Sequence, residues 1–364
     1  MSQVEVVIAG GGTAGHTNPG IAVAEALVAK GMSTESILFV GSSRGSEGEL
    51  VPAAGFKIET LDGRGVARKI SLTSLKSAMS LVKGIGQGIK LISSTKPKVV
   101  LSLGGYAAMP ASIGAILRRI PVVVTEQNAR ASSTNKFLSK FAANCALPFA
   151  ATDLPGEVTG NPIRSSILGL DLDRRLQARA ALGVADHQRL IAVWSGSLGA
   201  RSVNNAVRDM ADLILDRPEY FVYHVVGKRD FADHQTNGGK NYRVIEYETN
   251  MQRLLAAADV AICRAGASTV SELAIAGVPS ILIPLPGAPK DHQTHNAREL
   301  EKDGAAILLS DAELSGPRLL DILDEVTEIP ETRQAMSRAA LAVARPDAAS
   351  AVADMLITEG GLTI

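Results

Sequence analysis

The strongest constraint on the fold is a pattern that recurs along the whole chain. Short runs of consecutive apolar residues end in turns rich in small residues, and each turn leads into a helical stretch; examples are VEVVIAG, PKVVLSLGG and LIAVWSGS. Apolar residues at consecutive positions are typical of parallel strands that are buried on both faces. Strands that alternate with helices build such a sheet. We therefore predict an α/β fold of doubly wound, Rossmann-like sheets.

The pattern starts again near the middle of the 364-residue chain. At roughly 150 residues per domain, this length predicts two domains. The segment Gly160–Pro162 has turn-forming residues and suits a linker. We predict an N-terminal domain of residues 1–162 and a C-terminal domain of residues 163–340. Ligands of such sheets bind beyond the carboxyl ends of the strands, so two domains that face each other would form a binding cleft.

The most informative stretch is Cys263–Arg298. An apolar strand ends at its first residue, and the small residues Ala265–Ala267 then allow a tight turn in which backbone N–H groups can approach a ligand. Ser268 and Thr269 favour the start of a helix. A helix N-terminus carries a partial positive charge and unpaired N–H donors, so this turn predicts a phosphate site.

The same stretch continues with side chains that suit a nucleotide sugar. Glu272 lies about one helical turn further on, where its carboxylate could accept both hydroxyls of a ribose. The loop after the next strand carries Asp291, His292 and Gln293, which can hydrogen-bond a sugar. We predict a site for a nucleotide diphosphate sugar. The alternative is a turn that merely joins strand and helix, with Glu272 a solvated helix residue.

A second glycine pattern lies near the N-terminus. Gly10, Gly12 and Gly15 have the G-x-G-x-x-G spacing of a dinucleotide-binding loop. The acid expected at the end of the second strand is absent, because Gly41–Ser43 stand there, so we interpret the loop as a phosphate cradle that binds no nicotinamide nucleotide. His16 at its tip suits a hydrogen bond to that phosphate or the role of general base. The alternative is a loop histidine with neither role.

Further candidate site residues follow other strands. The glycine loop Leu103–Pro110 also ends a strand and opens a helix, so it could hold the second phosphate of a pyrophosphate. Glu126 adds a carboxylate at the same edge of the sheet, unless it caps a neighbouring loop. In the second half, Ser197 could bind a phosphate oxygen and Arg164 could neutralise a diphosphate.

Charge is distributed unevenly although the net charge is zero. Residues 1–164 hold 17 Lys and Arg against 10 Asp and Glu, and Gly63–Thr125 holds ten basic residues and no acid. Lys76, Lys83 and Lys90 recur every seven residues beside apolar positions, which on a helix gives an apolar stripe edged by lysine. We predict reversible contact with an anionic membrane surface. The alternative is a surface helix that packs on its own sheet; nucleic acid is not expected, because no recognition motif accompanies the charge.

Cellular compartment follows from cysteine usage and from targeting signals. Cys145 and Cys263 cannot build a disulfide framework, which favours a reducing cytoplasm. The sequence MSQVEVVIAGGG lacks the basic and apolar regions of a signal peptide. We also find no apolar run near 20 residues, so we expect no membrane span.

Taken together, these motifs resemble those of the MurG family. The segments that carry the resemblance run in the family's order from residue 10 to about residue 298; they are GGGTAGHTNPG, GGYAAMP, TEQN, STNK, TGNPIR, SGSLGARSVN and RAGASTVSELAIAGVPSILIPLPGAPKDHQTHNA. Members of this family are bacterial enzymes that transfer N-acetylglucosamine (GlcNAc) from UDP-GlcNAc to undecaprenyl-pyrophosphoryl-MurNAc-pentapeptide (lipid I), which gives lipid II for peptidoglycan synthesis. The resemblance implies the two-domain GT-B fold.

The resemblance also implies a division of labour between the domains. The N-terminal domain would bind the lipid-linked acceptor and the membrane, and the C-terminal domain would bind the donor. A C-terminal helix within residues 341–364 would cross back to the N-terminal domain. The implied location is the cytoplasmic face of the bacterial cell membrane, with other cell-wall synthesis proteins as further partners.

Individual residues take roles by the same resemblance. His16 is the first candidate for the catalytic base and Glu126 the second. The residues implied for UDP-GlcNAc binding are Arg164, Ser197, Ala267, Ser268, Thr269, Glu272 and Gln293. Those implied for acceptor binding are Thr13, Ala14, Gly15, His16, Gly104, Gly105, Tyr106, Asn128 and Asn135.

The chain departs from the family pattern at three positions. Thr125 stands where the family usually has a histidine before Glu-Gln-Asn. Thr294 replaces the second glutamine of the usual pair, which shifts sugar recognition towards Gln293 and His292. Ser195 replaces a usual glycine.

We therefore predict an inverting glycosyltransferase that moves GlcNAc to the C4 hydroxyl of MurNAc in lipid I. We expect no metal and no cofactor. Asp171 and Asp173 form a D-x-D pair, the metal motif of another class of glycosyltransferases, but they precede a helical stretch and suit helix capping better. The alternative function is a GT-B glycolipid synthase that transfers another UDP-hexose to diacylglycerol. A non-enzymatic or epimerase-like UDP-sugar binder would give the basic segment no role.

Overall fold

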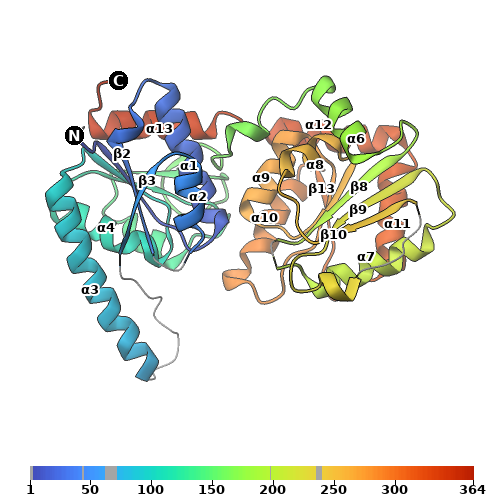
Figure 1. The fold of residues 1–364 in the computed structure, drawn as a ribbon, viewed down its shortest axis with the longest axis horizontal. Coiled ribbons are helices and arrows are strands. Elements are labelled where there is room, and N and C mark those ends of the chain that lie inside the picture. Colours follow the sequence, from blue (N-terminus) through green and yellow to red (C-terminus); the bar gives the residue numbers. More distant parts are fainter. Residues whose placement is uncertain (1–2, 43–44, 62–71, 197, 235–239) are drawn as a thin grey trace. The chain divides into compact units, whose positions relative to one another are not determined.

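The computed structural model describes residues 3–42, 45–61, 72–196, 198–234 and 240–364. Contacts divide the chain into two units, which we call unit 1 (Met1–Ser165 with Arg345–Ile364) and unit 2 (Ser166–Ala344). Each unit is a parallel sheet covered by helices (Figure 1). The predicted α/β class with two Rossmann-like domains is confirmed.

The sheet of unit 1 has the strand order β3-β2-β1-β4-β5-β6-β7, and all neighbouring strands are parallel. Its strands are β1 (Val6–Ala9), β2 (Ile37–Ser42), β3 (Lys57–Leu61), β4 (Val99–Ser102), β5 (Val122–Thr125), β6 (Asn144–Leu147) and β7 (Glu157–Val158). Its helices are α1 (Ala14–Ala29), α2 (Glu47–Ala53), α3 (Leu72–Thr95), α4 (Gly105–Leu117), α5 (Ser133–Leu138) and α13 (Ala348–Gly360).

The sheet of unit 2 repeats this topology with the order β10-β9-β8-β11-β12-β13. Its strands are β8 (Arg189–Trp194), β9 (Tyr220–Val225), β10 (Tyr242–Ile245), β11 (Val260–Cys263), β12 (Ser280–Leu282) and β13 (Ala306–Leu308). Its helices are α6 (Leu172–Leu182), α7 (Arg201–Leu213), α8 (Met251–Ala257), α9 (Ala267–Ala276), α10 (His292–Glu301), α11 (Gly316–Thr327) and α12 (Pro330–Val343). The strand order changes direction between β1 and β4 and between β8 and β11, which is where ligands bind in such sheets.

Consecutive apolar residues in the strands are buried on both faces of the sheet. In β1, Val6 and Ile8 belong to one core cluster, and Val7 and Ala9 belong to another. Helix α13 contributes to the first of these clusters and lies beside α1 in Figure 1 (red beside blue). The last helix of the chain is therefore part of the core of unit 1.

Helix α1 begins within the glycine loop that follows β1. The helix starts at Ala14, so Gly15 and His16, which we placed in the loop and at its tip, are helical, and Pro19 lies inside the same helix. Thr13 is the N-cap residue in an extended conformation. His16 consequently lies in the first turn of a helix and not at the tip of a loop.

The D-x-D pair caps a helix, as expected. Asp171 is the N-cap residue of α6, and its carboxylate accepts a hydrogen bond of 2.9 Å from the backbone N–H of Arg174. Asp173 lies in the first turn, where a negative charge complements the helix dipole. Among the described residues, no group of three or more His, Cys, Asp or Glu side chains could hold a metal ion.

Helix α3 packs against α4 through glycine. A Cβ at Gly88 would lie 2.2 Å from the carbonyl oxygen of Pro110, and one at Gly114 would lie 2.9 Å from the backbone of Gly88, so only glycine permits this approach. Leu91 and Ile92 are buried in the core of unit 1, which agrees with a helix that packs on its own sheet. The side chains of residues 72–81, which include Lys76, lie outside those described. No helix in the described ranges is long and apolar enough to span a membrane.

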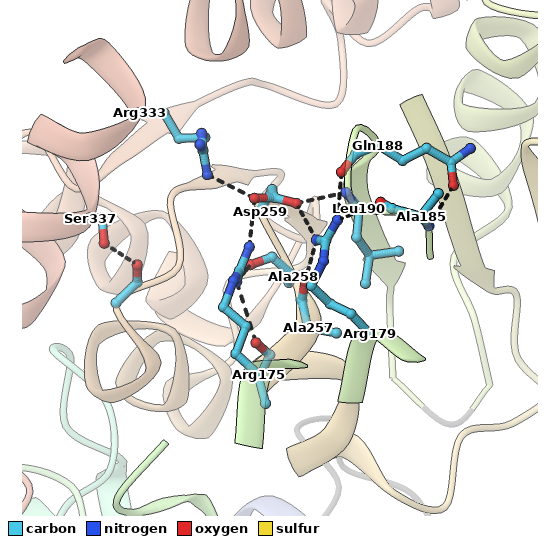
Figure 2. Close-up of polar contacts among 12 residues, drawn as sticks. Arg175, Arg179, Ala185, Gln188, Leu190, Ala257, Ala258, Asp259, Arg333 and Ser337 are labelled. Carbon is cyan, nitrogen blue, oxygen red and sulfur yellow. Dashed lines mark hydrogen bonds and ion pairs between the residues drawn. The ribbon is translucent and has the colours of Figure 1, made fainter. Parts of the chain in front are cut away.

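At the amino-terminal end of β11, one carboxylate gathers three arginines (Figure 2). Asp259 Oδ1 accepts hydrogen bonds of 2.7 Å from both Arg175 and Arg333, and Oδ2 accepts bonds of 2.8 Å from Arg179 and from the backbone N–H of Leu190. Asp259 is buried. It therefore links α6, α12 and β8 at the edge of the sheet where β11 begins.

Candidate functional site

Two of the donor-site residues predicted for the C-terminal half, Thr269 and Gln293, line a pocket in unit 2. It has a volume of about 240 Å³ and lies at the carboxyl ends of β8 and β11. The lining residues are Trp194, Ser195, Gly196, Gly199, Ala200, Arg264, Gly266, Thr269, Leu285 and Gln293. Ser197, predicted for the diphosphate, lies outside the described residues.

Two helices begin at the wall of this pocket. Helix α7 follows the N-cap residue Ala200 and helix α9 follows Gly266, and neither residue supplies a side-chain cap. Both N-cap residues line the pocket. Two uncapped helix N-termini make the pocket a favourable place for a diphosphate.

Two serine hydroxyls at the same edge have no partner among the described residues. Ser195 Oγ and Ser268 Oγ are buried and make no hydrogen bond with the described residues. Buried polar groups are normally paired, so these two hydroxyls are available to a ligand at this edge. A phosphate oxygen would satisfy both kinds of donor, the hydroxyls and the helix N–H groups.

Glu272 is a part-buried carboxylate in the second turn of α9. It forms no hydrogen bond or ion pair within the described ranges. Burial, followed by the charge of Glu272, raises the pKa of the Cys263 thiol, so the carboxylate lies beside the end of β11. Burial also raises the pKa of the Glu272 carboxyl to about 7. An unpartnered acid at this place can accept the hydroxyls of a ribose.

Gln293 is already oriented by the backbone. Its Oε1 accepts a hydrogen bond of 2.9 Å from the N–H of Leu285, so its NH₂ group is left to donate to a ligand in the pocket. His292 and Thr294 bond within their own turn, to the carbonyl of Pro289 and to the carboxylate of Asp291. Of these residues only Gln293 lines the pocket.

Arg264 is a pocket residue to which sequence analysis assigned no role. Its guanidinium donates to the carbonyls of Ile283 and Pro284 after β12, to Asp311 Oδ1 after β13, and to Ser202 Oγ in the first turn of α7. It therefore fixes the relative positions of four chain segments around the pocket. An arginine directly after an apolar strand, within a turn of small residues, is the signal that could have found it.

Arg164 does not line this pocket. The structure places it in unit 1, where its Nη2 lies 3.9 Å from Glu25 Oε1 on α1. Its Nε is buried and has no hydrogen-bond partner among the described residues. Its predicted role towards the diphosphate stays a prediction.

In unit 1, the predicted acceptor residues gather at the carboxyl ends of β1, β4 and β5. A Cβ at Gly105 would lie 3.7 Å from the carbonyl oxygen of Gly11, so the two glycine loops are neighbours. Tyr106 at the start of α4 is 62% exposed and available to a ligand. Ala14 and Gly15 lie in the first turn of α1.

His16 is held by Thr13 within that first turn. The distance between Thr13 Oγ1 and His16 Nδ1 is 3.0 Å. If the ring donates this bond through Nδ1–H, Nε2 is the nitrogen that could accept a proton. The role of His16 as the base stays a prediction.

Glu126, the second candidate base, is buried and fully engaged by its own loop. Oε1 accepts from the N–H groups of Gln127 and Asn128 and from the Asn128 side chain. Oε2 accepts from the N–H of Ser132 and from Asn135 Nδ2. Five hydrogen bonds therefore end on the carboxylate. This geometry fits the alternative, in which Glu126 caps a neighbouring loop, better than it fits the role of a proton acceptor.

Asn135 lies beneath the second glycine loop. It is buried, donates to the carbonyl of Thr125 and to Glu126, and would be only 2.9 Å from a Cβ at Gly104. Gly104 has a φ of 80°, which also favours glycine. Asn135 therefore supports the loop from inside, and its side chain is not exposed to a ligand.

Comparisons with known proteins match this chain over nearly its whole length. The N-terminal domain of glycosyltransferase family 28 matches residues 6–147, and the C-terminal domain of that family matches residues 190–352. The UDP-N-acetylglucosamine–N-acetylmuramyl-(pentapeptide) pyrophosphoryl-undecaprenol N-acetylglucosamine transferase of Desulforudis audaxviator is 37% identical over 368 residues, which cover 97% of this chain and 98% of the relative.

Two further matches agree with the first. The transferase of the same name from Pseudomonas putida is 38% identical over 360 residues, with 97% of each chain covered. The crystal structure of Acinetobacter baumannii MurG matches with a TM-score of 0.77 and 28% identity, over 97% of this chain and 99% of that one.

Proposed function

We propose that this chain, which belongs to the MurG family within glycosyltransferase family 28, transfers GlcNAc from UDP-GlcNAc to the C4 hydroxyl of MurNAc in lipid I. The single observation that carries the proposal is the similarity, over 97% of the chain, to a relative that is named as the N-acetylglucosamine transferase of this reaction. The pocket of unit 2 supports it, because two uncapped helix N-termini and the oriented Gln293 line the pocket. Glu272, which has no partner among the described residues, follows further along α9.

In this proposal unit 2 binds the donor. The diphosphate lies at the N-termini of α7 and α9, Glu272 accepts the ribose hydroxyls, and the Gln293 NH₂ group donates to the GlcNAc. The helix N-termini stabilise the charge that develops on UDP as it leaves, a kind of electrostatic stabilisation that often dominates catalysis. Arg264 holds the segments that carry these groups.

Unit 1 binds the acceptor through its two glycine loops and supplies the base. The C4 oxygen of MurNAc forms a bond to the anomeric carbon of GlcNAc as the bond from that carbon to the UDP oxygen breaks, which inverts the anomeric configuration. The proton of the C4 hydroxyl passes to His16. Glu126 and Asn135 shape the neighbouring loop.

UDP release is the direct test of this function. UDP-GlcNAc with a short-chain lipid I analogue should release UDP, whereas UDP-GalNAc, UDP-glucose or omission of the analogue should give little release. Release with diacylglycerol in place of the analogue, and none with lipid I, would support a glycolipid synthase and contradict the proposal.

We also propose that unit 1 attaches to the cytoplasmic face of the cell membrane through α3. Lys83 and Lys90 are exposed on this helix, and Val82 is 70% exposed. Each lysine near an anionic surface contributes about 1 kcal/mol to binding. An acid-free basic segment beside an apolar side chain suits reversible attachment. Contacts with other cell-wall synthesis proteins stay a prediction from the resemblance.

Neutralising both lysines should weaken this attachment. We expect Lys83→Gln/Lys90→Gln to lower the partition coefficient on anionic vesicles by about 30-fold at low salt, which corresponds to about 2 kcal/mol. Vesicle flotation measures the change, and Lys240→Gln on unit 2 is the matched control. Binding of the double variant equal to that of the wild type would contradict the role of α3.

The raised pKa of Glu272 should make both the stability of the protein and its affinity for the donor depend on pH. Its ordinary pKa is 4.5, and burial raises it to about 7 in the folded chain. The stability that this group contributes is fully present below pH 4.5 and is lost as the pH rises through 7, because the folded state then buries an ionised carboxylate. Denaturant unfolding of the ligand-free protein should show that Glu272→Gln loses less stability than the wild type between pH 5 and pH 8.

Donor binding should change in the opposite direction over the same range. Ribose hydroxyls donate to the ionised carboxylate, so binding favours the deprotonated form. We expect the Kd of UDP-GlcNAc for the wild type to fall as the pH rises from 6 to 8, and the Kd for Glu272→Gln to stay nearly constant. Calorimetric titration gives both curves; parallel curves would show that another group titrates.

A further inference from the structure

Glu47 is a buried acid to which sequence analysis assigned no role. It is the first residue of α2 and is only 1% exposed. Its Oε2 accepts a hydrogen bond of 2.7 Å from the N–H of Gly12. Its Oε1 accepts bonds of 2.8 Å and 3.0 Å from the N–H and the hydroxyl of Ser42. The carboxylate therefore ties the glycine loop after β1 to the end of β2.

Three glycines make room for this carboxylate. A Cβ would lie 2.4 Å from Glu47 Cδ if placed at Gly11, 2.5 Å from Cγ if placed at Gly41, and 1.9 Å from Oε2 if placed at Gly45. Any side chain at these positions would displace the acid. The loop that we interpreted as a phosphate cradle therefore also contacts a carboxylate of the protein itself, through Gly11 and the N–H of Gly12.

Position along the sequence explains why the acid was missed. An acid was sought at the end of the second strand, where Gly41 and Ser42 stand. The structure brings one to the same place from the next helix, α2. With Glu47 there, the N–H of Gly12 is already paired and a negative charge already lies beneath the loop.

The bond to Gly12 lies next to the residue that holds His16. Gly12 has a φ of 97°, a conformation that L side chains rarely adopt, and it leads directly into Thr13, the N-cap residue of α1. Thr13 in turn contacts the His16 ring at Nδ1. Glu47 thereby fixes the point from which Thr13 and His16 take their orientation.

We propose that Glu47 is a positioning residue for the transfer reaction, whose carboxylate fixes Gly12 and, through Thr13, the orientation of His16. The inference rests on the proposed function, in which His16 is the base. Glu47 is buried beneath the loop and acts on the reaction only through these neighbours.

Glu47→Gln tests the proposal while preserving the volume of the side chain. The glutamine NH₂ group cannot accept a hydrogen bond, so it would oppose either the N–H of Gly12 or the N–H of Ser42. We expect kcat to fall about tenfold or more, with the KM for UDP-GlcNAc within about twofold of the wild type, because the proposed donor residues lie in unit 2. Glu49→Gln, an exposed acid on the same helix, is the matched control and should change neither quantity.

A double-mutant cycle separates positioning from general loss of structure. If Glu47 acts through His16, Glu47→Gln should cost little further activity in a His16→Ala background. Full additivity of the two losses would overturn the proposal, and so would unchanged kcat in Glu47→Gln. If Glu47→Gln melts below the assay temperature, Glu47→Asp is used instead. The aspartate keeps the carboxylate, so this variant should be more active than Glu47→Gln.

One readout does not depend on turnover. The NMR resonance of the His16 ring, assigned among the six histidines by its loss in His16→Ala, should shift in Glu47→Gln and stay in place in Glu49→Gln. An unmoved resonance would overturn the positioning role whatever the substrate. A shifted resonance in a protein that fails to transfer GlcNAc to lipid I would keep the positioning role and reject the proposed function.

Discussion

Glu272→Ala is expected to lower kcat/KM for UDP-GlcNAc by about 100- to 1,000-fold. A hydrogen bond to a charged group contributes about 1.5–3 kcal/mol, and the carboxylate would accept two from the ribose. Part of this free energy is offset at neutral pH, because the wild type must first ionise an acid whose pKa is about 7. Initial rates of UDP release should be measured at pH 8. The carboxyl of the wild type is then ionised, so the difference in kcat/KM between the wild type and Glu272→Ala is largest.

A change in the ligand makes this expectation specific to the ribose. A UDP-GlcNAc analogue with a 2′-deoxyribose removes one of the two hydroxyls from the donor. It should bind the wild type more weakly than UDP-GlcNAc does, and it should bind Glu272→Ala about as well as UDP-GlcNAc does. Glu301→Ala, an exposed acid on α10, is the control for loss of charge. An equal penalty for the analogue in all three proteins would exclude Glu272 as the ribose ligand.

Asp259→Ala is expected to destabilise unit 2 by about 3–5 kcal/mol. Removing one partner of a buried ion pair leaves the other charge without compensation. The Arg179 side chain is only 11% exposed and would lose its carboxylate, as would Arg175 and Arg333 (Figure 2). The backbone N–H of Leu190 would lose its acceptor as well. For a unit of this size, the melting temperature should fall on the order of 10 °C.

Activity should survive this substitution at low temperature. Asp259 precedes β11, whereas the pocket lies at the other end of that strand. We therefore expect kcat/KM at 15 °C to stay within about threefold of the wild type, and Asp303→Ala, an exposed acid, to melt like the wild type. Lost activity in a variant that melts normally would show that the cluster acts on the site and not on stability.

Much of the fold followed from local patterns. Consecutive apolar residues such as Val6–Ala9 and Val260–Cys263 predicted strands buried on both faces, and these strands form the centres of the two sheets. The D-x-D pair was correctly interpreted as a helix cap, because capping depends on residues only three positions apart. His16 was placed at the tip of a loop, whereas it lies in the first turn of α1.

The site was predictable only where its residues are close in sequence. The turn from Ala265 to Thr269, with Glu272 one helical turn on, is a local arrangement, so its residue types alone indicated a phosphate and a ribose. The pairing of Gln293 with the backbone of Leu285 was not predictable, because it depends on how the loop after β12 folds back.

What the sequence determined by itself was therefore the α/β class, the family resemblance and the residue types of the turn from Ala265 to Thr269, all of which depend on short-range order. The tertiary structure alone decided which carboxylates accept hydrogen bonds from other parts of the chain. Glu126 is saturated by its own loop, Glu47 lies beneath a glycine loop 35 residues away, and Glu272 has no partner among the described residues. These three carboxylates look alike in sequence. Their tasks differ because hydrogen-bond donors reach them from distant segments that only the folded sheet brings together.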